Sequence, residues 1–74
     1  MNKYTKYEYP KGTWNVYTST SALIGVIHRC RDNSGIIFFR AVIIDGNSSR
    51  IRSDLWPSLD MAQNWIVEVY ESKL

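Results

Sequence analysis

The chain has 74 residues, 45% of them apolar, and a formal net charge of +2, which suffices for one domain with a small core. Its single cysteine, Cys30, excludes an intramolecular disulfide and a cysteine-rich zinc site, and a lone thiol suits a reducing cytoplasm. The apolar runs are far shorter than the roughly 20 residues of a membrane-spanning helix, so we expect no membrane contact. The polar first residues lack a signal-peptide pattern. We therefore expect one cytoplasmic domain over residues 1–74.

Two strands and a tight turn are predicted at the beginning of the chain. In residues 3–9, Tyr4, Lys6 and Glu8 alternate with Thr5, Tyr7 and Tyr9, and an alternation that contains tyrosines is typical of a strand. The sequence Pro10-Lys11-Gly12 predicts a β-turn with proline in its second position and glycine in its fourth. Residues 13–18 predict a second strand, with Trp14 and Val16 on one face.

A third strand is predicted over residues 22–31, where strict alternation assigns each side chain to one of two faces. The first face holds Ala22, Ile24, Val26, His28 and Cys30, and the second holds Leu23, Ile27, Arg29 and Arg31. Because the first face is mainly apolar, we expect the helix to cover it, including His28 and Cys30.

The fourth predicted strand, residues 36–45, has the strongest β signal of the chain. It follows the turn sequence Asp32-Asn33-Ser34-Gly35 and is apolar on both faces apart from Arg40, so we expect it inside the sheet. A turn at residues 46–48 and a short polar segment at residues 49–53 come next. The segment is a candidate fifth strand, so the sheet has four to five strands.

An amphipathic helix is predicted over residues 58–72. Pro57 and Ser58 form a start signal with Ser58 as N-cap, and Asp60 in the first turn favours the positive end of the helix dipole. One apolar stripe at helical spacing contains Leu59, Ala62, Trp65, Ile66, Val69 and Tyr70. The predicted fold is therefore α+β: an antiparallel meander sheet packed on one C-terminal helix.

Charge is divided unequally along the chain. Residues 1–52 contain eight basic and three acidic residues, a balance of +5, whereas residues 53–74 contain one basic and four acidic residues, a balance of −3. Five arginines occur in the predicted strands: Arg29, Arg31, Arg40, Arg50 and Arg52. Arginine pairs with phosphate or carboxylate through two parallel hydrogen bonds, so these residues are candidate partner contacts. Alternatively, they are solvated residues that prevent aggregation at sheet edges, and the strand register is left open.

Three tyrosines near the start, Tyr4, Tyr7 and Tyr9, are further candidate partner contacts. Exposed aromatic side chains stack on nucleic-acid bases or form hot spots for a protein partner. The alternative is that they fill a small core, although strand alternation does not bury Tyr4 together with Tyr7 and Tyr9.

The sequence contains little that indicates catalysis. His28 and Cys30 are a candidate thiol–imidazole pair, but the apolar residues beside them favour an inert, buried thiol. Metalloprotease, phosphate-loop and zinc-ligand spacings are absent from the sequence. We therefore expect neither an enzyme nor a metal or cofactor.

Residues 25–69, three strands with arginines followed by a helix, resemble in outline the sheet-plus-helix DNA-binding domains of plant ethylene-response factors and integrase arms. That resemblance implies a sheet inserted into the major groove. The chain departs from the pattern because it lacks the compact Trp/Arg arrangement and adds the hairpin at residues 3–18. In size it also resembles the small orphan proteins of phages and mobile elements, which implies inhibition by blocking a surface.

These observations favour a small protein-binding module, an inhibitor or adaptor of phage or mobile-element type that acts by surface blocking. The alternative is a nucleic-acid-binding domain that uses an arginine-rich sheet face. A net charge of +2 is low for a dedicated DNA-binding monomer, which places the protein partner first. A homodimer is compatible with either function.

Overall fold

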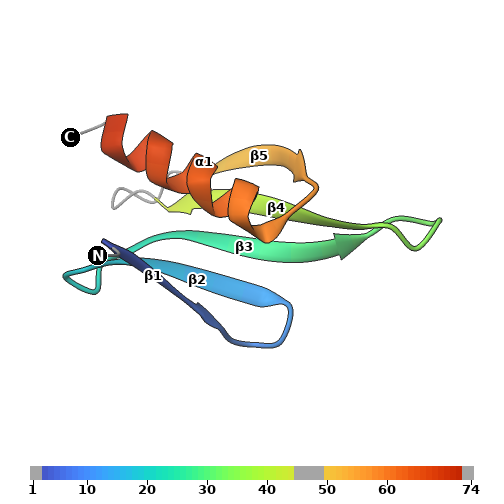
Figure 1. Cartoon of the computed structure of the whole chain (residues 1–74), viewed down its shortest axis with the longest axis horizontal. Coiled ribbons are helices and arrows are strands. Elements are labelled where there is room, and N and C mark those ends of the chain that lie inside the picture. The colour runs from blue at the N-terminus through green and yellow to red at the C-terminus, as the bar shows by residue number, and fades with distance from the viewer. Residues whose placement is uncertain (1–2, 45–49, 73–74) are drawn as a thin grey trace.

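The computed structural model describes residues 3–44 and 50–72, with the backbone alone for residues 50–54. Its elements are β1 (Tyr4–Glu8), β2 (Thr13–Thr18), β3 (Leu23–Arg31), β4 (Ile37–Ile44), β5 (Arg50–Trp56) and α1 (Leu59–Ser72). Each strand pairs antiparallel with the next, so the order across the sheet is the order in the chain. Figure 1 shows α1 crossing one face of this sheet. The predicted α+β meander is confirmed.

The local signals for turns and for the helix start have direct counterparts in hydrogen bonds. Asp32 Oδ1 accepts the backbone N–H groups of Ser34 at 2.8 Å and Ile36 at 2.9 Å, which closes the turn between β3 and β4. Ser58 Oγ accepts the N–H of Met61 at 3.2 Å, the bond of an N-cap. Both sequence predictions are confirmed.

The first turn and strand β5 differ in position or length from the sequence predictions. The first turn lies one residue later than predicted, because the N–H of Thr13 donates to the carbonyl of Pro10 and puts Gly12, at φ +88°, in the third position. Strand β5 extends to Trp56, which pairs with Phe39 in β4. The predicted turn at residues 46–48 and the predicted strand positions 45 and 49 lie outside the described residues.

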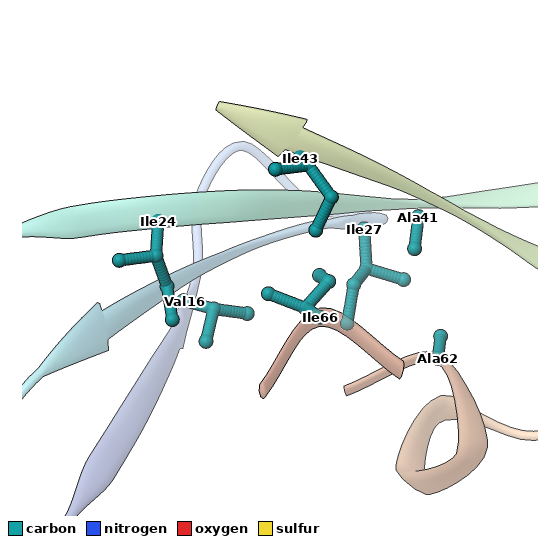
Figure 2. Packing of buried hydrophobic residues seen from close by; sticks show 7 residues of the cluster. All are labelled: Val16, Ile24, Ile27, Ala41, Ile43, Ala62 and Ile66. Carbon is teal, nitrogen blue, oxygen red and sulfur yellow. The ribbon is translucent and has the colours of Figure 1, made fainter. Parts of the chain in front are cut away.

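The core lies between α1 and the sheet. Seven buried side chains form it: Val16, Ile24, Ile27, Ala41, Ile43, Ala62 and Ile66. Figure 2 shows Ile66 of α1 beside Ile27 of β3, with Ala62 also on the side of α1 that faces the sheet. Around this cluster pack half-buried residues of the apolar stripe that the helical spacing predicted, including Leu59, Trp65 and Val69.

Gly25 allows the helix to approach β3 closely. A Cβ at this position would lie 2.8 Å from both Cδ1 and Cγ2 of Ile66, and 3.1 Å from the carbonyl oxygen of Val42. Contacts this short are repulsive, so the closest approach of helix and sheet requires glycine here.

A bulge in β3 corrects the predicted faces of that strand. Val16 pairs with Gly25 but Tyr17 pairs with Leu23, so Ile24 is an extra residue on β3. Ile24 and Ile27 consequently both enter the core although they are three positions apart. The expectation that α1 covers His28 and Cys30 was therefore wrong.

The correction extends to every residue of β3 beyond the bulge. The extra residue places Val26, His28 and Cys30 on the face away from α1, and His28 is exposed.

Two side-chain bonds connect the far edge of the sheet to the helix. Tyr4 donates its hydroxyl to Glu71 Oε2 at 2.8 Å, and Lys6 Nζ donates to Gln63 Oε1 at 2.7 Å. The hydrogen bond to Glu71, followed by burial and the negative charge of Glu71, raises the pKa of Tyr4 above its ordinary value. Strand β1 is thereby attached to the same helix that packs on β3 and β4.

Candidate binding surface on the open face of the sheet

The face of the sheet that points away from α1 is defined by the strand register, and we call it the open face. Directly paired residues lie on the same face of an antiparallel sheet. One row of the open face therefore contains Tyr7, Asn15, Val26 and Val42, and the next contains Thr13, His28, Arg40 and Leu55. Tyr17 and Leu23 form a third row.

Apolar and aromatic side chains of the open face are accessible to solvent. The exposed fractions are 65% for Tyr7, 39% for Leu23 and 42% for Leu55. The rings of Tyr7 and Tyr17 pack edge to face with centroids 5.9 Å apart, which holds the exposed Tyr7 against the half-buried Tyr17. Val26 and Val42 are half-buried between these residues, so the surface has an apolar centre.

Among the described strand pairs, the formally charged side chain of the open face is Arg40. Arg40 and His28 are paired across β3 and β4, and both are exposed. Thr13 Oγ1 lies 3.4 Å from His28 Nδ1, which links the imidazole to β2. Among the side chains that the structure describes, no Asp or Glu occupies an open-face position, because Glu8 pairs with Trp14 on the helix side and Asp32 closes a turn.

The structure divides the five candidate arginines between two faces. Arg29 and Arg31 are exposed and pair with Phe39 and Ile37, on the side of the sheet that carries α1. Arg40 belongs to the open face. Arg50 and Arg52 pair by backbone with Ile44 and Val42, and their side chains lie outside the described part of the structure.

The three candidate tyrosines are also separated. Tyr4 packs against the core and against Tyr70, with ring centroids 6.3 Å apart, so it belongs to the fold. Tyr7 lies on the open face. Tyr9, 79% exposed, follows β1 at the edge of that face.

His28 and Cys30 do not form a thiol–imidazole pair. The thiol of Cys30 donates to the backbone oxygen of His28 at 3.7 Å, while the imidazole faces Thr13. Within residues 3–44 and 50–72, no group of three or more His, Cys, Asp or Glu is placed to hold a metal ion.

Sequence reasoning did not name Tyr17, Leu23, Val42 or Leu55 as partner contacts of this surface. Each is an ordinary apolar strand residue, and only the register shows that they adjoin Arg40 and Tyr7. One available signal was Gly25 inside a strand, since glycine there often marks a bulge or a close backbone approach.

Comparisons with protein-family models, with curated proteins and with solved structures found no match to this chain. Among the described residues, no helix has both the length and the apolar character needed to cross a membrane.

Proposed function

We propose that the protein is a non-catalytic binding module of the cytoplasm whose open face docks onto a protein partner. The observation that carries the proposal is a sheet face that no described element covers. Helix α1 packs on one side, and the other side presents exposed Tyr7, Leu23 and Leu55 around Arg40. Exposed apolar surface of this kind, bordered by polar groups, is typical of interaction sites.

The composition of the open face fits a protein better than a phosphate backbone. Aromatic side chains and arginine are enriched in protein interfaces and supply most of their hot spots. The valines at the centre, Val26 and Val42, offer a nucleic acid no hydrogen bond, but a protein partner gains free energy by covering them. Because its described charges are basic, the open face complements an acidic region of the partner.

Inhibition by surface blocking is the mode of action that we propose for this surface. A small rigid sheet that covers an acidic functional surface of a larger protein prevents other molecules from binding there. This mode of action is the one implied by the resemblance to small phage and mobile-element proteins, and it needs no catalytic group.

Capture of the partner with matched variants tests the proposal. Tagged wild-type protein is used to capture partners from cells of its source, alongside Tyr7→Ala, Arg40→Glu and Arg31→Glu. Arg31→Glu is the control because it makes the same charge change on the neighbouring strand, β3, and on the opposite face of the sheet. We expect capture to be lost with Tyr7→Ala and Arg40→Glu and kept with Arg31→Glu, and loss with the control alone would contradict the proposal.

Nucleic-acid binding is the second candidate, favoured by Arg40 together with the backbone pairing of Arg50 and Arg52 on neighbouring positions of β5. Titration against labelled duplex and single-stranded DNA at two salt concentrations separates the candidates. Micromolar binding that weakens steeply with salt and is lost with Arg40→Glu would replace the protein partner by a phosphate backbone. A concentration-dependent mass in light scattering that Tyr7→Ala abolishes would instead identify the partner of the open face as a second copy.

A further inference from the structure

A groove lies on the helix side of the sheet, at the flank of α1 away from β1. Its volume is about 190 Å³, and its lining residues are Trp56, Met61, Asn64, Trp65 and Glu68. Four of them have the spacing i, i+3, i+4 and i+7, which places them along one stripe of the helix. The fifth, Trp56, is the last residue of β5.

The groove is suited to a cationic side chain. Two indole rings and the exposed thioether of Met61 form its walls, and Glu68 contributes a carboxylate without a hydrogen bond or ion pair among the described residues. Indole faces and carboxylates both attract cations, and α1 contains no basic residue to compete. The volume is below the roughly 300 Å³ at which small-molecule pockets begin, so the groove fits one side chain rather than a whole cofactor.

The groove adjoins a free edge of the sheet. Strand β5 is the last in the order β1 to β5, so half of its backbone N–H and C=O groups face outward without a partner among the described strands. A segment added to such an edge sends every second side chain toward the helix side, where the groove lies.

We propose that the edge of β5 and this groove together form a strand-addition site for an extended segment of a partner protein that carries a lysine or arginine. The backbone of the segment pairs with β5, and its basic side chain enters between Trp56 and Trp65 and meets Glu68. The site is separate from the open face, which lies on the other side of the sheet, so a partner bound there leaves it accessible.

Synthetic peptides added to the full chain test the site. The probe is acetyl-TVKVT-amide, with acetyl-TVEVT-amide and an analogue N-methylated at both valines as controls. Binding is followed by tryptophan fluorescence, because two of the three tryptophans line the groove. We expect saturable binding of the lysine peptide at about 1 mM or below, and about tenfold weaker binding of the two control peptides.

Variants locate the binding and separate it from the proposed function. Glu68→Gln is expected to weaken the lysine peptide about tenfold, whereas Asp60→Asn, the same charge change outside the groove, leaves it unchanged. Arg40→Glu should abolish capture of the open-face partner and leave the peptide affinity intact. Amide hydrogen exchange should show new protection in β5 when the lysine peptide is bound.

Three results would overturn the strand-addition site. They are no saturable signal at about 1 mM peptide, equal binding of the lysine and glutamate peptides, and binding that Glu68→Gln does not change. Self-association that Glu68→Gln abolishes would show that the occupant is another copy of this chain rather than a partner.

Discussion

Gly25→Ala is expected to destabilise the protein although it adds a single methyl group. The new Cβ would lie 2.8 Å from two carbons of Ile66 and 3.1 Å from the Val42 carbonyl oxygen, so α1 must move away from β3 or Ile66 must leave its rotamer. Overpacking of this kind costs about 1–3 kcal/mol. A chain of 74 residues has a total stability of about 4–11 kcal/mol, so the loss is a large fraction of it.

Urea denaturation followed by tryptophan fluorescence measures this cost as a fall in the midpoint at constant slope. In thermal unfolding, each kcal/mol corresponds to about 4–8 °C for a domain of this size. The reasoning assigns the cost to Ile66, so Ile66→Val, which removes the Cδ1 that contacts the new methyl group, should reduce it. We expect a coupling free energy of about 0.5–1 kcal/mol between the two substitutions.

Gly35→Ala is the matched control for this cycle. Gly35 has φ +85° and no atom within 4 Å of its Cβ position, so its substitution costs free energy through backbone strain alone. That cost should add to the effect of Ile66→Val within about 0.5 kcal/mol. Wild-type stability of Gly25→Ala, or zero coupling with Ile66→Val, would refute the close helix–sheet contact.

Substitutions at three further residues test other contacts. Hydrogen bonding to Glu71 raises the pKa of Tyr4 above 10.0, so its stabilisation is complete below about pH 10 and is lost as pH rises through the native-state value. The urea midpoint should fall in that range, and less steeply in Tyr4→Phe; equal profiles would contradict the bond. Asp32→Ala should cost about 1 kcal/mol and speed hydrogen exchange at Ser34, while Asp32→Asn, which keeps the acceptor oxygen, costs less. Ser58→Ala should lower stability by about 1 kcal/mol and Ser58→Asp should not; equal losses would show that the cap is dispensable.

The sequence predicted those elements whose formation depends on residues close together in the chain. The helix follows from apolar spacing and the cap at Ser58, and the turn after β3 follows from the Asp32 side chain and its own backbone. Each of these signals involves only a few neighbouring residues, so it can be recognised in a single sequence. The order of the strands in the meander follows from short connections between neighbours.

The candidate site was predicted less well, because the face of each strand residue depends on pairing with another strand. One extra residue, Ile24, moves His28 and Cys30 from the helix side to the open face. The same register separates Arg40 from Arg29 and Arg31, which sequence reasoning had grouped together. The groove beside Glu68 could not be predicted from the sequence either, because it forms between α1 and Trp56 at the end of β5.

The position of α1 after all five strands has a consequence for biosynthesis. The ribosome releases the sheet strands first, and the apolar side chains of Val16, Ile27 and Ile43 remain without a cover until Ala62 and Ile66 have emerged. During that interval both faces of the nascent sheet are bare, which makes it a substrate for chaperones that hold exposed apolar chains. A frameshift or stop codon within the helix would leave these side chains without their cover, so we expect the truncated chain to aggregate.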